Sequence, residues 1–354
     1  METIREWLRR HFNNPQVVGL ALVLLAGFVI VILFGNMLAP VLASVVFAYL
    51  LDGPVAVLER HRVRRTLAVT AVSLLFLLVL LFTLLGILPR LSAQLTQLID
   101  QVPDMVARGH EALMRLPERF PEFVSEDQVI ELITALRSEA GRLGQRVLSL
   151  SLASLLGLIT FLVYLILVPL LVFFFLKDKE QIIGWLSAHL PRERTLSATV
   201  WREVHAQIGN YVRGKVWEIF IVGAVSYVTF TFLGLQYSVL LATLVGLSVI
   251  IPYIGATVVT IPVALVAYFQ WGWSAQFAWL LIAYLVIQVL DGNVLVPLLF
   301  SEAVNLHPIA IIVAVLFFGG LWGFWGVFFA IPLATLVQAV IRAWPRAREF
   351  PAEA

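Results

Sequence analysis

From Ile219 to Ile341 the chain contains no lysine or arginine, and the only acidic residues in this stretch are Asp291 and Glu302. The apolar segments within this stretch are long, and apolar and polar residues do not strictly alternate in them, which is typical of membrane-spanning helices. The whole chain is 61 % hydrophobic and 13 % charged, whereas a soluble domain carries about 25 % charged residues. The sequence therefore predicts an all-α polytopic membrane protein, with the lipid bilayer as its surroundings.

Asp291 is the most informative residue in this apolar stretch. A carboxylate at hydrocarbon depth costs about 2.5–3.5 kcal/mol on insertion scales. Asn293 and Pro297 interrupt the same run, and backbone freed at membrane depth is tolerated only where protein or a watery cavity satisfies it. We expect Asp291, Asn293 and Pro297 to line a pathway for a small-molecule or ion substrate. The alternative places Asp291 near a helix end, at the headgroups.

Two longer segments, Val239–Phe269 and Ile309–Ile341, are too long to be simple straight spans. The first would be about 46 Å long as one helix, against a hydrocarbon core of about 30 Å. Both contain residues that interrupt helices, so either both are single kinked, tilted spans or both are re-entrant hairpins. The candidate pathway residues in these interruptions are Pro252, Tyr253, Gly255, Gly319, Gly320, Gly323 and Gly326.

The hairpin alternative predicts an internal repeat. A span followed by a hairpin would occur twice, entering the membrane from opposite sides, which is an inverted repeat. A weak sequence similarity between the two segments supports this repeat, because Gly255 precedes Pro262 much as Gly326 precedes Pro332.

The basic clusters predict the orientation and the domains. Arg60, Arg62, Arg64 and Arg65 should be cytoplasmic, since cytoplasmic loops carry the excess of arginine and lysine, and both termini follow on that side. We expect N-terminal membrane helices in residues 1–88 and an external helical segment in residues 89–148. A membrane helix with a cytoplasmic amphipathic helix should follow in residues 149–215, and a transport-type unit in residues 216–354.

Two finer expectations concern residues at the edges of these domains. Pro103, Pro117 and Pro121 should divide the external segment into short helices, because proline interrupts helices. Arg213 and Lys215 should be interfacial anchors, with a substrate role as the minority alternative.

The sequence lacks the motifs of common catalytic sites. It has no cysteine, which excludes disulfides, thiol catalysis and cysteine metal sites. There is no Walker A loop, GxSxG or HExxH motif. We therefore expect no enzyme, no cofactor, no metal and no nucleic-acid partner. His307 lies near an aqueous loop and is better explained as a loop residue than as a proton carrier.

Five segments resemble a known family when taken together. They are FFFLKDKE, YVRGK, IPYIGATVVTIP, LDGNVLVPLLFSEAVNLHP and FFGGLWGFWGVFFAIPLATL. The chain resembles the autoinducer-2 exporter (AI-2E) family over essentially its whole length. The resemblance implies a bacterial inner-membrane protein with about eight membrane segments. It also implies a homopentamer that exports small molecules, notably the furanone autoinducer-2.

Three functions follow as hypotheses. The first is a secondary transporter, or permease, that exports a small polar molecule such as autoinducer-2. The second is exchange of sodium or lithium ions for protons, which the resemblance also implies. The third, from another class, is a non-transporting oligomeric scaffold organised by residues 89–148.

Overall fold

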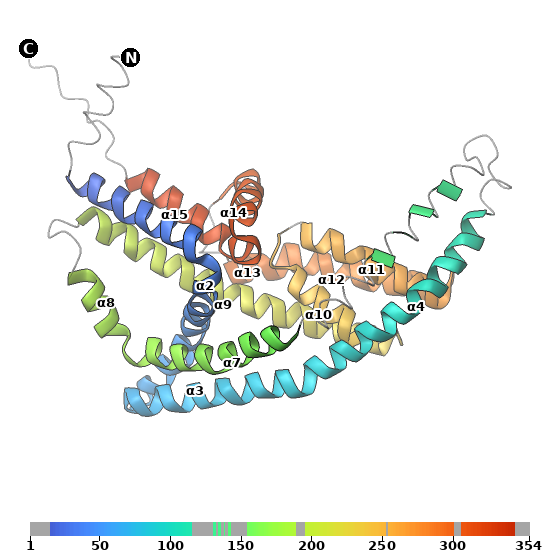
Figure 1. Cartoon of the computed structure of the whole chain (residues 1–354), viewed down its shortest axis with the longest axis horizontal. Helices are drawn as coiled ribbons and strands as arrows, with labels where there is room; N and C mark the ends of the chain where they lie inside the picture. The colour runs from blue at the N-terminus through green and yellow to red at the C-terminus, as the bar shows by residue number, and fades with distance from the viewer. Residues whose placement is uncertain are drawn as a thin grey trace, which may run out of the picture.

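The computed structural model describes residues 15–114, 154–188, 195–252, 254–300 and 306–343, together with residues 130, 131, 134, 135, 138, 141 and 142. Within this part of the chain all regular structure is helical (Figure 1). The helices are α2 (Pro15–Arg60), α3 (Arg65–Phe82), the π-helix η1 (Thr83–Ile87), α4 (Leu88–Met114), α7 (Ser154–Lys177), α8 (Lys179–Ala188), α9 (Thr195–Phe232), α10 (Ser238–Ser248), α11 (Ile254–Trp271), α12 (Ala275–Leu290), the π-helix η2 (Asp291–Leu295), α13 (Val296–Phe300), α14 (Pro308–Phe328) and α15 (Ala330–Ala343).

Six helices in the described ranges are long and apolar enough to cross a membrane, or seven if the bent pair of α7 and α8 forms one span. The chain is therefore a multi-pass membrane protein. The all-α prediction is confirmed for the described residues, whereas the expected count of about eight segments is not.

Helices α3 and α7 pack with the C-terminal part of α2 around one hydrophobic core, and we call this group the α2, α3 and α7 layer. Phe28, Val46 and Tyr49 of α2 belong to a second core with α9, α14 and α15. Val69, Val172 and Leu176 are almost fully buried in the first core. Ser44 is also buried, and its hydroxyl lies 2.6 Å from the Pro40 carbonyl oxygen and 3.3 Å from that of Val168 on α7. The buried hydroxyl therefore has polar partners on both helices of the pair.

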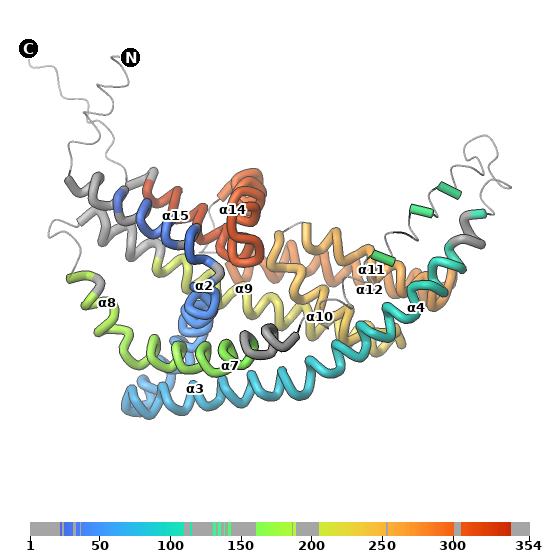
Figure 2. Tube along the Cα trace, in the orientation of Figure 1, coloured from blue at the N-terminus to red at the C-terminus, as the bar shows by residue number. Residues whose placement is uncertain are grey.

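Helices α3, η1 and α4 join into one rod that extends to the opposite end of the molecule from α8 (Figure 2). Its 50 positions from Arg65 to Met114 correspond to about 75 Å, so the rod extends well beyond a hydrocarbon core. The predicted break at Pro103 is wrong, since α4 continues through it. Proline removes one backbone hydrogen bond, and on this exposed rod water can satisfy the freed carbonyl. Pro117 and Pro121 lie outside the described residues.

The rod also contacts the C-terminal half. The side-chain oxygen of Gln94 accepts a hydrogen bond of 2.8 Å from the Leu240 N–H, at the start of α10. Arg108 donates to the Phe269 carbonyl near the end of α11 at 3.4 Å. These two contacts satisfy backbone groups that helix ends leave free. They attach the rod to two helices of the C-terminal half.

Helix α9 is continuous from Thr195 to Phe232. The sequence predicts an amphipathic helix followed by a span that begins at Val216, whereas one continuous helix runs through both parts. No proline interrupts the stretch, so nothing forces the helix to end. The C-terminal half of α9 packs closely on α10, where a Cβ on Gly246 would lie 3.0 Å from the Gly223 Cα atom.

The two segments that are too long for simple spans, Val239–Phe269 and Ile309–Ile341, are each divided into two helices. Residues 249–253 separate α10 from α11, and the non-helical Gly323 interrupts α14 shortly before α15 begins. Both interruptions lie where the sequence predicts them. Whether either pair of helices re-enters the membrane from one side stays a prediction, as does the inverted repeat.

Candidate functional site

The first interruption lies between α10 and α11. An added Cβ on Gly255 would overlap the carbonyl oxygen of Ser248, so the chain turns back tightly here and only glycine fits. The Pro252 carbonyl accepts a hydrogen bond of 2.7 Å from the Ile254 N–H. The Lys215 ammonium of α9 donates to the Val249 carbonyl at 2.9 Å. A side chain from another helix thus satisfies a carbonyl that the end of α10 leaves free.

The second interruption, between α14 and α15, is built in a similar way. Gly323 has φ 57° and ψ −131°, a backbone conformation that side chains with a Cβ rarely adopt. An added Cβ on Gly326 would overlap the carbonyl oxygen of Phe318. The Tyr211 hydroxyl of α9 donates to the Phe328 carbonyl at 3.2 Å. Helix α9 therefore supplies a polar side chain to each interruption.

Three polar side chains of α9 lie on one face. Tyr211, Lys215 and Glu218 follow the helical spacing of four and three residues. Lys215 Nζ lies 2.6 Å from Glu218 Oε2, and the two residues are only 4 % and 2 % exposed. Gly214 beside them lets α13 approach, because a Cβ there would lie 2.8 Å from the Phe300 ring. We call Tyr211, Lys215 and Glu218 the α9 polar face.

Asp291 begins the π-helix η2 and is half-buried. Its Oδ1 atom is buried and has no hydrogen-bond partner among the described residues. The charge of Asp291 interacts with those of Lys215 and Glu218. Two carboxylates therefore share the field of one ammonium group, and the fully ionised group has a net charge of −1. A buried excess charge is costly unless it is balanced, so this group can accept a proton or a cation.

The other predicted pathway residues lie in different surroundings. Asn293 is exposed and donates to the Val289 carbonyl of its own helix at 2.9 Å. Pro297 and Gly320 are exposed, with nothing within 4 Å of a Cβ added to Gly320. A Cβ added to Gly319 would lie 2.8 Å from the Val327 side chain, so this glycine lets the two residues of α14 approach each other. Tyr253 lies outside the described residues.

The structure thus connects both interruptions to α9, through the carbonyls of Val249 and Phe328. It leaves Asn293, Pro297 and Gly320 on the outer surface. Among the described residues no three histidine, aspartate or glutamate side chains could together hold a metal ion.

Sequence reasoning missed the α9 polar face. Lys215 is buried instead of lying at the interface, because Glu218 and the Val249 carbonyl compensate its charge and its donors. In the sequence, the apolar stretch in which Asp291 stands out begins at Ile219, directly after Glu218. Glu218 therefore counts with the charged segment before it, although no basic residue follows Lys215 until Arg342. The spacing of Tyr211, Lys215 and Glu218 along one helical face would have revealed the group.

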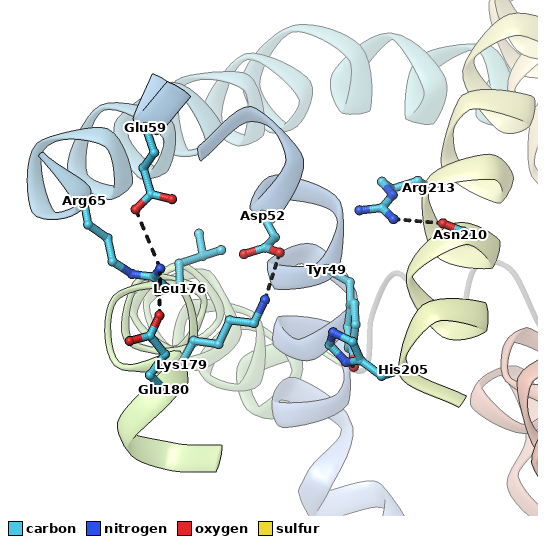
Figure 3. A network of polar contacts seen from close by, with 10 residues as sticks. All are labelled: Tyr49, Asp52, Glu59, Arg65, Leu176, Lys179, Glu180, His205, Asn210 and Arg213. Carbon is cyan, nitrogen blue, oxygen red and sulfur yellow. Dashed lines mark hydrogen bonds and ion pairs between the residues drawn. The ribbon is translucent and has the colours of Figure 1, made fainter. Parts of the chain in front are cut away.

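A second polar network joins α9 to the layer of α2, α3 and α7 (Figure 3). The Tyr49 hydroxyl of α2 and the His205 Nδ1 atom of α9 lie 2.7 Å apart. Asp52 of α2 pairs with Lys179 of α8 at 2.9 Å. Arg65 of α3 donates to the Leu176 carbonyl at 3.0 Å. This network ties the start of α8 and the N-terminal half of α9 to the first layer.

The chain is similar in sequence to known transport proteins over nearly its whole length. The model of the AI-2E family transporter matches residues 20–346. The chain is 49 % identical over 345 residues, covering 98 % of both chains, to the protein named "Putative permease PerM" of Escherichia coli K12. It is 25 % identical over 332 residues to the AI-2 transport protein TqsA of the same organism, covering 91 % of this chain and 92 % of TqsA. The chain therefore belongs to the AI-2E family of transporters.

Proposed function

We propose that this protein is a secondary transporter that exports a small polar molecule, with an autoinducer-2-like solute as the first candidate. The relative TqsA is named for AI-2 transport. The observation that carries the proposal is the buried Lys215–Glu218 pair beside a helix interruption, with the half-buried Asp291 close enough to interact with both charges. Ionisable residues at membrane depth mark substrate and ion pathways.

Asp291 is the coupling acid in this proposal. Protonation or ion binding at its unpartnered Oδ1 atom removes the excess negative charge and lets Lys215 act on Glu218 alone. Because Lys215 also donates to the Val249 carbonyl, this change reaches the α10–α11 turn. The α9–α15 half then moves against the α2, α3 and α7 layer, as the repeats of known carriers do.

Sodium or lithium exchange for protons is the second candidate. The observation that favours it is the charge of the group, two carboxylates against one ammonium, which leaves room for one monovalent cation. In either case we place the protein in the bacterial inner membrane with both termini in the cytoplasm, and we propose that it assembles as a homo-oligomer, with the pentamer as the first form to test.

Flux into proteoliposomes tests the coupling role. The probes are autoinducer-2, and Na⁺ or Li⁺ with a pH-sensitive dye, at several values of pH. We expect Asp291→Asn to lose most of the flux and its pH dependence, and Asp291→Glu to retain part of both. Asp100→Asn, an exposed acid on α4, is the matched control and should behave as the unchanged protein.

Unchanged flux and unchanged pH dependence in Asp291→Asn would remove Asp291 from the mechanism. Dye signals that respond to Na⁺ or Li⁺, with no autoinducer-2 flux, would favour the antiporter. Background flux of every probe in the folded, purified oligomer would favour the non-transporting scaffold.

A further inference from the structure

Helix α8 carries an apolar surface that the described helices leave uncovered. Ile182 and Ile183 are 39 % and 38 % exposed, and Trp185 is 67 % exposed. The helix has ten residues, and isolated helices this short are only marginally stable in water. It stands apart from the helical bundle in Figure 1. The exposed parts of these side chains therefore face outward from the chain.

The direction of α8 indicates what these side chains face. The chain bends by 79° between α7 and α8, and α7 is an apolar helix of membrane-spanning length. If α7 alone is the span, a helix nearly perpendicular to it at its end lies along the membrane surface. Tryptophan is enriched at the level of the headgroups. The bend thus places the exposed face of α8 where an interfacial helix belongs.

An unpaired basic turn lies beside α8. Arg60, Arg62 and Arg64 are exposed in the turn between α2 and α3 and have no ion-pair partner among the described residues. The turn is tied to α8 by Arg65, whose Nη1 atom lies 3.4 Å from Glu180 Oε1 (Figure 3). The helices on both sides of the turn are candidate spans, so the three guanidinium groups lie at headgroup level.

The acidic groups nearby are mostly neutralised. Glu59 and Glu180 share Arg65, and Asp52 is paired with Lys179. Asp178 has no ion pair within the described ranges, and Lys177 precedes it directly. The three arginines of the turn therefore give this end of the molecule a positive surface that complements phospholipid phosphates.

We propose that α8 and the α2–α3 turn form a docking surface for an anionic phospholipid leaflet, with the apolar side chains of α8 in the interface and the three arginines on lipid phosphates. The surface fixes the α2, α3 and α7 layer in the bilayer, so that the α9–α15 half has a stationary partner. The proposal concerns the layer and not the solute site, and it stands even if the protein transports nothing.

The first measurement asks whether α8 lies in the interface. Because the chain has no cysteine, a single Gly184→Cys can carry a fluorophore, and nothing lies within 4 Å of a Cβ at Gly184. The full-length protein is placed in nanodiscs that contain spin-labelled phosphatidylcholine. We expect strong quenching at position 184. Gln101→Cys is the control and should show little quenching, because Gln101 is exposed and lies about 54 Å along the rod from Arg65.

The second measurement asks whether the arginines select anionic lipid. Native mass spectrometry reads the ratio of phosphatidylglycerol to phosphatidylcholine retained by the protein from mixed nanodiscs. One basic side chain near a charged surface corresponds to about fivefold in affinity, so Arg64→Gln should lower the preference about fivefold and the triple Arg60, Arg62 and Arg64→Gln variant should abolish it. Arg90→Gln, an exposed arginine on α4, should leave it unchanged.

Equal quenching at positions 184 and 101 would overturn the docking surface. Disulfide-linked dimers of Gly184→Cys without lipid quenching would also overturn it and indicate a second copy of the chain as the covering partner. An unchanged lipid preference in the triple variant would overturn the role of the arginines. Added inorganic phosphate should not displace the retained phosphatidylglycerol, and displacement would show that the site binds free phosphate instead.

Discussion

The α10–α11 turn and the α14–α15 turn are both tight turns that accept a hydrogen bond from α9, but the side chains that stabilise them differ. Each contains one glycine, Gly255 or Gly326, whose missing Cβ lets the chain pass against its own carbonyl. Each has a carbonyl that accepts a hydrogen bond from α9. The donor is a charged lysine in the first turn and a neutral tyrosine in the second. The first turn therefore depends on a buried charge, which can change with ion binding.

Packing distinguishes the second turn from the first. Phe318 and Trp322 stack with ring centroids 5.7 Å apart, and Trp325 and Phe329 stack at 6.1 Å. Stacked aromatic pairs add about 0.5–1.5 kcal/mol beyond the area that they bury. The second turn thus has stacked aromatic pairs of its own, whereas the first turn is held by the buried aliphatic side chains of Val249 and Ile250 and by the hydrogen bond from Lys215. This difference predicts that the first turn is the movable one.

The largest effect should come from the close glycines. We expect Gly255→Ala and Gly326→Ala to give little or no folded protein, because the new methyl group would overlap a backbone oxygen that no side-chain rotation can move. Gly320→Ala and Gly292→Ala are the controls, since nothing lies within 4 Å of a Cβ at either position. Size-exclusion chromatography of the detergent-solubilised variants reads the folded fraction. Normal yield of either close-glycine variant would show that its turn is looser than described.

Lys215 should give the next effect, and it should act on the first turn. Lys215→Met leaves Glu218 buried without its ion pair, which costs about 3–5 kcal/mol. The double variant Lys215→Met and Glu218→Met should recover most of that stability, because a buried ion pair can be replaced by apolar side chains at little cost. Thermal unfolding of both variants in detergent measures the difference.

Transport separates the structural role of Lys215 from a functional one. If the pair acts only in stability, the double variant should transport normally. We expect its flux to remain low, because the charge that couples Asp291 to the Val249 carbonyl is gone. Normal flux in the stable double variant would count against coupling through the first turn.

The sequence predicted the positions of both turns but not what supports them. Turns depend on local chemistry, and the glycine and proline residues that make them are visible in a single segment. Lys215 and Val249, or Tyr211 and Phe328, are far apart along the chain, so their contacts exist only after folding. At Pro103 the local sequence misled in the opposite direction. The proline predicted a helix break, but α4 continues through it on the exposed rod. Asp291 stood out because an isolated acid is visible in sequence, whereas Glu218 was hidden at the edge of a basic segment.

The smallest effect should come from Tyr211, the donor to the second turn. Tyr211→Phe removes one neutral hydrogen bond to the Phe328 carbonyl, which contributes about 0.5–1.5 kcal/mol, while the ring keeps its contacts with Phe300 and Phe328. We expect a small decrease in thermal stability and flux close to that of the unchanged protein, because the stacked aromatic residues still hold the turn. If Tyr211→Phe instead lowered flux as strongly as Lys215→Met, both turns would move during transport. The contrast between a charged, movable turn and a packed, stationary one would then be wrong.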